Sequence, residues 1–299
     1  MYVVTGATGH TGNVVAEALL SRGEKVRVIG RTAERLKALA AKGAEPFAAD
    51  LADAAGLAKA FAGAKAVYVV LPPNLASSDY PSFQKRVTDA IVAALRSTGV
   101  SHAVTLSSIG ADKPDKTGPV LGLHYLEEEL NRIDALNVLH LRAGYFMENT
   151  LPQVGVIRML GSVAGPIQPD LKLPLIATRD IGNAAADALL RLEFRGKQTR
   201  ELQGQRDIDY VEVASIIGKA IGKSSLGYIQ APDDQLRAAF VQMGMSANFV
   251  GLLLEMVGAL NSGHMRALEP RSAANTTPTA FETFVNEEFA PAYRQQAAA

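Results

Sequence analysis

The chain has 299 residues, and its 30 Lys and Arg residues balance 30 Asp and Glu residues to a formal net charge of +0 at pH 7. This balance argues against direct nucleic-acid binding through phosphate neutralisation. The absence of cysteine excludes disulfides, thiolate nucleophiles and cysteine-bound metals. The first residues show neither the basic nor the apolar segment of a signal peptide, and no apolar run approaches the roughly 20 residues of a membrane span. We therefore expect a cytoplasmic protein with no membrane partner.

The first half of the sequence alternates strand-like and helix-like segments. Apolar runs predict strands at 2–5, 26–29, 44–48, 66–71, 103–106 and 138–141. The intervening segments predict helices at 11–22, 34–42, 54–62, 83–98 and 123–134. Glycines end four of these helices, where a left-handed residue is favoured: Gly23, Gly43, Gly63 and Gly99. The pattern predicts an α/β fold with a doubly wound parallel sheet.

After about residue 143 this alternation breaks down, because glycines and prolines divide the chain into short pieces. We expect helices at 180–192, 210–221, 233–243 and 247–260, and a strand at 199–203. The sequence thus predicts a dinucleotide-binding domain at 1–150, to which 178–204 return, and a smaller, mostly helical substrate domain at 151–299.

A glycine-rich turn follows the first predicted strand and opens the first predicted helix. Its sequence is Thr-Gly-Ala-Thr-Gly-His-Thr-Gly over residues 5–12, inside a unit of about 30 residues. Gly6 permits a tight turn, Gly9 lets the backbone approach a pyrophosphate, and Gly12 lets the helix pack closely on the strand. The free N–H groups and dipole of the helix start favour an anion. The expected contacts come from Gly6, Thr8, Gly9, His10, Thr11 and Gly12.

This Gly-x-x-Gly-x-x-Gly spacing resembles the extended and atypical short-chain dehydrogenase/reductases, and the sequence beyond it resembles their NmrA-like branch. The resemblance is specific in the first 110 residues and in Leu-Arg-Ala-Gly-Tyr-Phe-Met-Glu-Asn-Thr at 141–150. It implies either an NADPH-dependent quinone or dye reductase, or a redox-sensing regulator that binds the dinucleotide without turnover.

The end of the second predicted strand indicates which dinucleotide is bound. An acidic residue there would grip the ribose 2′-OH of NAD, but this strand ends in Arg31, which can pair with a 2′-phosphate. We therefore predict NADP(H), with Arg35 as a helper. In relatives an Asp at the position of Asp50 hydrogen-bonds the adenine amine, although Asp50 would also serve as a helix cap. The backbone of Leu71 and Pro72 is expected to line the cofactor groove.

The catalytic constellation typical of the superfamily is incomplete. Its serine has candidates in Ser107, expected to line the cofactor, and Ser108, but no Tyr-x-x-x-Lys follows. By resemblance His124 takes the tyrosine position and Glu128 the lysine position. At i and i+4 these two could pair, so that Glu128 orients the imidazole and His124 donates a proton. Tyr125 with Glu129 is the alternative register, and an exposed ion pair is the alternative to function.

The segment that leaves the sixth predicted strand is expected to reach the substrate, because ligands lie beyond the carboxyl ends of such strands. Gly144 would allow close approach to the nicotinamide, and Tyr145, Phe146 and Asn149 would line the pocket. Thr178 and Asp180 would either contact substrate or cap a helix. No histidine spacing suits a metal site.

Two functions remain open at this point. One is a reductase of a small quinone-like or conjugated acceptor, because such an acceptor needs no dedicated proton donor. The other is a non-catalytic NADP(H) sensor that acts through a regulatory protein partner. A nucleotide-sugar isomerase or epimerase is disfavoured by the missing Tyr-x-x-x-Lys, and the apolar helix 247–260 could form the face of a homodimer.

Overall fold

The computed structural model describes residues 1–295 and contains one seven-stranded, all-parallel sheet in the order β10-β6-β5-β4-β1-β2-β3. The strands are β1 (Tyr2–Val4), β2 (Val26–Gly30), β3 (Glu45–Ala48), β4 (Ala66–Val69), β5 (His102–Ser108), β6 (Asn137–Ala143) and β10 (Lys197–Leu202). The predicted doubly wound parallel sheet is confirmed.

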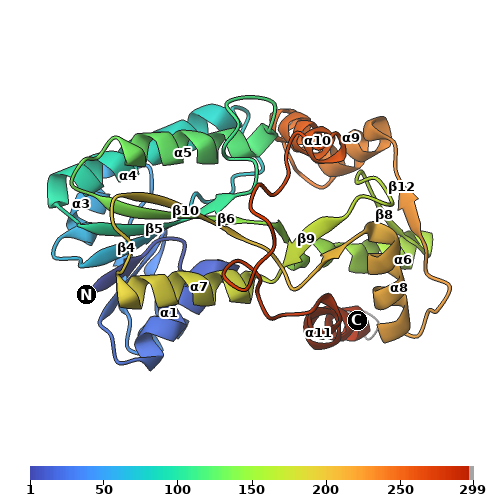
Figure 1. Cartoon of the computed structure of the whole chain (residues 1–299), viewed down its shortest axis with the longest axis horizontal. Coiled ribbons are helices and arrows are strands. Elements are labelled where there is room, and N and C mark those ends of the chain that lie inside the picture. The colour runs from blue at the N-terminus through green and yellow to red at the C-terminus, as the bar shows by residue number, and fades with distance from the viewer. Residues whose placement is uncertain (296–299) are drawn as a thin grey trace.

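Helices cover both faces of this sheet, as Figure 1 shows. One layer contains α3 (Ala54–Phe61), α4 (Tyr80–Thr98) and α5 (Leu121–Asn131), and the other contains α1 (His10–Ser21) and α7 (Thr178–Arg191). The 3-10 turn η1 (Ala33–Leu36) and the short α2 (Lys37–Ala41) replace the single helix predicted at 34–42. Two hydrophobic cores, one on each face, hold the layers together.

The sequence explains why these elements begin and end where they do. Strands β1 and β4 are buried at every position, as their continuous apolar runs require. Asp53 caps α3 by accepting from the Ala55 N–H at 3.1 Å, and Asp79 caps α4 by accepting from the Ser82 N–H at 3.1 Å. The four predicted C-terminal glycines all have positive φ, from 65° at Gly99 to 97° at Gly43.

The strand order places a topological switch point between β1 and β4. Tyr2 pairs with Val26 of β2 on one side and with Ala66 of β4 on the other. The crossovers run in opposite directions from this point, which leaves a crevice at the carboxyl ends of the two strands.

The second half of the chain builds a lobe with its own hydrophobic core. Most of its regular structure is helical: α6 (Gln153–Leu160), α8 (Tyr210–Ala220), α9 (Asp233–Gln242), α10 (Ala247–Asn261), α11 (Phe281–Phe284), the π-helical turn η4 (Val285–Phe289) and α12 (Ala290–Gln295). Two short sheets complete it, one formed by β7 (Tyr145–Phe146), β9 (Leu173–Ile176) and β11 (Asp207–Ile208), the other by β8 (Val163–Gly165) and β12 (Tyr228–Gln230).

The chain passes three times between the lobes, after β6, after β9 and after β10. After β9 it returns to the first lobe, where α7 packs on α1 and β10 pairs in parallel with β6. The division near residue 150 stays a prediction. The sequence reading missed α6 and the two small sheets, because strands of two to four residues are too short for a periodic pattern. In residues 1–295 no helix is long and apolar enough to cross a membrane.

Candidate functional site

The glycine-rich turn forms a cradle at the switch point, between β1 and α1. Gly6 has φ +58°, and a Cβ there would lie 2.4 Å from Val70 Cγ1. A Cβ on Gly12 would lie 2.3 Å from the Gly6 carbonyl oxygen, so the helix approaches the turn as predicted. Gly9 is the N-cap of α1 and supplies no side-chain hydrogen bond. The first amides of α1 are thus left for an anion, next to the exposed Thr8 and His10.

Thr11 has a structural partner that the sequence did not indicate. Its hydroxyl accepts a hydrogen bond from Tyr68 Oη at 3.0 Å, in the interior between α1 and β4. Burial raises the pKa of the Tyr68 hydroxyl, which keeps the phenol protonated as the donor. The Thr11 hydroxyl oxygen is thus engaged inside the fold, and the backbone of Thr11 is left to face a ligand.

Two predicted residues lie exposed at the carboxyl ends of β2 and β3. The Arg31 side chain makes no hydrogen bond or ion pair with any described residue. Asp50 Oδ1 accepts from the Ala52 N–H at 2.9 Å, and its other oxygen is not used in this turn. Because Asp53 caps α3, Asp50 is not needed as the helix cap.

The loop after β4 carries Leu71 and Pro72, which are both partly buried. The start of α10 fixes this loop from the second lobe. The Ser246 N–H donates to the Leu75 carbonyl at 2.9 Å, and the Tyr80 N–H donates to Asn248 Oδ1 at 2.9 Å. The second lobe therefore lies against the carboxyl edge of the sheet (Figure 1).

The end of β5 contains a buried polar network that sequence reasoning missed. Ser107 Oγ donates to Glu127 Oε1 at 2.5 Å, so its hydroxyl points between the sheet and α5. Arg142 of β6 binds the same carboxylate through Nε at 3.0 Å and Nη2 at 2.5 Å. This pair ties β5, β6 and α5 together. Ser108 lies one residue further along and donates to the Ile109 carbonyl at 2.9 Å.

A second buried network lies behind the first on the same strands. His140 Nε2 lies 3.1 Å from Asn131 Oδ1, and its Nδ1 lies 2.9 Å from Thr105 Oγ1. Since the amide oxygen can only accept, Nε2 carries the proton and Nδ1 accepts from the threonine. Burial lowers the pKa of His140 to about 4, so the ring is neutral.

The predicted contact between His124 and Glu128 is not formed. His124 Nδ1 instead lies 2.8 Å from the carbonyl oxygen of Ala111. Glu128 is 52% exposed, and its nearest cation is Arg132 at 3.7 Å. Glu128 lies one turn beyond His124 on α5, and its side chain is directed toward solvent and the C-terminal end of the helix. The Ala111 carbonyl that binds His124 instead lies just after β5, at the carboxyl edge of the sheet. The alternative pair, Tyr125 with Glu129, is not formed either, because the Tyr125 hydroxyl donates to Asp89 at 2.8 Å.

The segment after β6 passes directly into the second lobe. A Cβ on Gly144 would lie 2.2 Å from the Pro174 carbonyl oxygen, so the close approach here is to β9. Tyr145 and Phe146 form β7 and are partly buried, and Asn149 is exposed. Burial raises the pKa of the Tyr145 hydroxyl, and hydrogen bonding with Tyr210 and Asn149 partly offsets this effect.

Glu148 lies in the segment at 141–150 but was not among the predicted site residues. Its Oε1 accepts from both the N–H of Thr178, at 2.8 Å, and the Thr178 hydroxyl, at 2.5 Å. Glu148 thereby caps α7, and Thr178 is the first helical residue, whose backbone N–H is satisfied by this cap. Asp180 accepts from the N–H and hydroxyl of Thr279, at 3.0 and 2.8 Å. Thr178 and Asp180 are thus both engaged in hydrogen bonds within the fold, and their contact with substrate stays a prediction.

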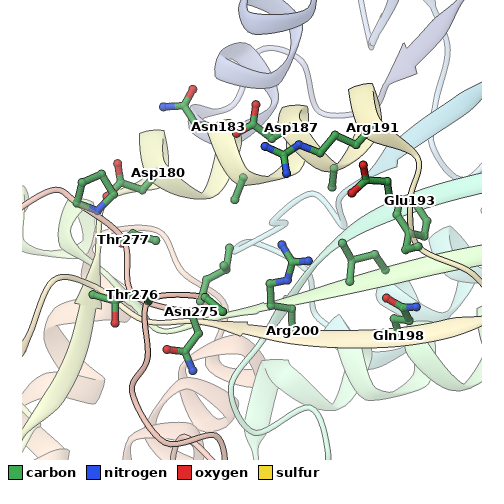
Figure 2. A pocket seen from close by; sticks show the side chains of 18 residues that line it. Asp180, Asn183, Asp187, Arg191, Glu193, Gln198, Arg200, Asn275, Thr276 and Thr277 are labelled. Atoms are coloured by element: carbon green, nitrogen blue, oxygen red, sulfur yellow. The ribbon is translucent and has the colours of Figure 1, made fainter.

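A groove lies elsewhere, between α7, β10 and residues 273–278, and encloses about 620 Å³ (Figure 2). Arg191 of α7 and Arg200 of β10 project into it from opposite walls. None of the cofactor or catalytic residues predicted from the sequence lines it. We place the candidate site at the carboxyl edge of the sheet, because the uncapped N-terminus of α1 and the strand ends converge there.

Comparison with known proteins agrees with this geometry. The model of the NmrA-like family matches residues 2–285. The chain belongs to the NmrA-like family. An NAD(P)H azoreductase from Xenophilus azovorans is 27% identical over 260 residues, 86% of either chain. Quinone oxidoreductase 2 of Escherichia coli is 27% identical over 269 residues, 88% of this chain and 89% of the relative.

The solved structure of another reductase shares the fold of this chain. Triphenylmethane reductase from Citrobacter sp., crystallised with NADP(H), superposes with a TM-score of 0.81. The superposition covers 96% of this chain and 99% of the reductase, at 20% sequence identity. The likeness therefore extends over both lobes.

Proposed function

We propose that this protein is an NADP(H)-dependent oxidoreductase that transfers a hydride to a quinone-like or other conjugated acceptor. The observation that carries the proposal is the uncapped start of α1 at the switch point, with glycines where side chains would collide. Two relatives named as an azoreductase and a quinone oxidoreductase support the same chemistry.

Arg31 selects the phosphorylated dinucleotide. Its guanidinium is exposed at the end of β2 and has no carboxylate partner among residues 1–295, so it can bind the 2′-phosphate without breaking an existing ion pair. Asp50 retains a free carboxylate oxygen for the adenine amine. Leu71 and Pro72 would line the groove between the two halves of the cofactor.

The nicotinamide half would extend from the α1 cradle toward β5 and β6, where Ser108, Gly144 and Tyr145 lie. When bound, the reduced cofactor supplies the hydride. The protein supplies position, because the acceptor must lie against the ring beneath the second lobe. Phe146, Tyr145 and Asn149 form the matching wall on the acceptor side.

His124 is the candidate proton donor, and its ring orientation defines which nitrogen acts. The Ala111 carbonyl can only accept, so Nδ1 carries a proton in both charge states of the ring. Nε2 is then the nitrogen that gains or releases the proton. Glu128 is not needed for this orientation, because the backbone carbonyl provides it.

A quinone-like acceptor suits a site without Tyr-x-x-x-Lys. Addition of hydride to the quinone forms a hydroquinone anion, in which the aromatic ring stabilises the charge. One proton, from His124 Nε2 or from water, completes the hydroquinone. A simple ketone would form an alkoxide instead and would depend on a strong proton donor.

The test follows NADPH absorbance with quinones, azo dyes and conjugated ketones, for the wild type, His124→Ala and the control His102→Ala. His102 starts β5 at the opposite edge of the sheet, so its variant should retain activity. We expect a loss on the order of a hundredfold for conjugated ketones in His124→Ala and a smaller loss for quinones. Equal activity of all three proteins would leave positioning and solvent protonation as the mechanism. Binding of NADPH without turnover of any acceptor would refute the reductase in favour of the sensor.

A further inference from the structure

Glu148 has one carboxylate oxygen with two hydrogen bonds and one with none. Thr178 donates twice to Oε1, whereas Oε2 is buried and has no partner among the described residues. The residue as a whole is 9% exposed. A buried carboxylate oxygen without a donor costs free energy, so a ligand that supplies the donor would be bound preferentially.

The position of Glu148 brings this oxygen close to the cofactor cradle. Glu148 lies in η3 (Met147–Thr150), four residues beyond Gly144 and five beyond Ala143, the end of β6. It caps α7, and α7 packs so closely on α1 that a Cβ on Gly182 would lie 3.0 Å from the Thr11 carbonyl oxygen. The starts of α1 and α7 are therefore neighbours, and Glu148 lies between the glycine-rich turn and the exit of β6.

No described residue donates a hydrogen bond to Glu148 Oε2. Glu288 lies in η4 near both Glu148 and His10, and burial together with the Glu148 charge raises the pKa of its carboxyl. Arg179 is engaged with Glu287 at 2.5 Å and with Thr279 at 3.1 Å. The unpartnered oxygen thus lies in a region that also contains the positive start of α1, His10 and a second acid, Glu288.

We infer that Glu148 Oε2 accepts a hydrogen bond from the carboxamide NH2 of the nicotinamide, an inference that rests on the proposed binding of NADP(H). In a doubly wound fold the dinucleotide crosses the switch point with its adenosine over β2 and β3. The nicotinamide then lies over β5 and β6, close to Glu148, which follows β6 in the chain. The carboxamide NH2 is the amide donor on this half of the cofactor. By holding it, Glu148 fixes which face of the ring is turned toward the acceptor.

The experiment compares the affinity of NADP+ with that of its 3-acetylpyridine analogue, which replaces the carboxamide NH2 by a methyl group. Dissociation constants come from calorimetry, so no turnover is needed. For the wild type we expect the analogue to bind roughly ten- to a hundredfold more weakly, because a hydrogen bond to a buried charged group is lost. This arm requires no variant and does not depend on a substitution being tolerated.

Glu148→Gln provides the second arm. Its amide oxygen would keep the bonds from Thr178, and its NH2 would replace Oε2 and could donate to the acetyl oxygen. We therefore expect this variant to lose the preference for NADP+ and to bind the analogue at least as tightly as the wild type does. Glu282→Gln, an exposed acid that pairs with Arg206 and not with Arg179, should retain the wild-type ratio.

The outcomes separate this inference from the proposed function. Wild-type protein that binds NADP+ and the analogue equally, with no change in Glu148→Gln, would overturn the role of Glu148 and leave cofactor binding intact. Wild-type protein that binds neither ligand would overturn both.

Discussion

Replacement of Arg31 by alanine tests the basis of cofactor choice most directly. The side chain is exposed and has no hydrogen bond or ion pair within residues 1–295, so its loss should change the free energy of unfolding by no more than about 0.5 kcal/mol. A hydrogen-bonded guanidinium–phosphate pair contributes about 1.5–3 kcal/mol. We therefore expect NADPH to bind roughly ten- to a hundredfold more weakly to Arg31→Ala, and NADH to bind with unchanged affinity.

The assay is fluorescence titration of both dinucleotides at two salt concentrations, because exposed charge pairs are screened by salt. Arg22→Ala is the matched control: Arg22 is an exposed arginine just past the far end of α1. Twelve residues separate it from the cradle, about 18 Å along the helix. Arg35→Ala should have a smaller effect than Arg31→Ala. Equal wild-type affinity for NADPH and NADH would refute the assignment of Arg31.

Two further predictions concern stability. Gly12→Ala should destabilise the protein by about 1–3 kcal/mol in urea unfolding and weaken NADPH binding, because the new Cβ would lie 2.3 Å from backbone at Gly6. Gly155→Ala, in α6 with nothing within 4 Å, should instead stabilise by up to about 1 kcal/mol; destabilisation by both substitutions would contradict the packing argument. His140 has a pKa of about 4 when folded and near 6.5 when unfolded, so the unfolded chain takes up the proton first and stability falls as the pH drops from about 6.5 to about 4. This histidine accounts for a loss of about 3 kcal/mol of unfolding free energy at most. His140→Gln should therefore show a flatter profile of stability against pH between pH 7 and 4. Identical slopes for the wild type and His140→Gln would refute this prediction.

The comparison of sequence with structure shows which inferences hold and why. The six strands of the first half and the glycines at its helix ends were predicted from local pattern, because burial on both faces and positive φ each restrict the residue types at single positions. The cradle was predicted for the same reason: the requirements at Gly6 and Gly12 arise within a few residues of chain. The expected pairing of His124 with Glu128 was wrong, since helical spacing allows a contact but does not exclude better partners such as the Ala111 carbonyl and Arg132.

Gly144 and Glu148 show what lay beyond local pattern. The close approach at Gly144 is to Pro174, thirty residues later in the chain, which local pattern could not show. The contact of Gly144 with the nicotinamide stays a prediction. Glu148 is a candidate ligand for the cofactor because of two facts that only the structure shows. Thr178, also thirty residues away, occupies one of its carboxylate oxygens, and the other, Oε2, has no donor among the described residues.

The sequence by itself determined the parallel sheet, the glycine-rich turn of a dinucleotide-binding unit, and the presence of Arg31 at the strand end where an acid would favour NAD. Each of these depends on neighbours within one βαβ unit. Only the tertiary structure decided which polar side chains are already engaged and which are free. Thr11, Ser107 and Glu127 are bound inside the fold, whereas one oxygen of Glu148 is not. Hydrogen bonds between distant segments are set by packing of the helices on the sheet, and single-residue patterns carry no information about that packing.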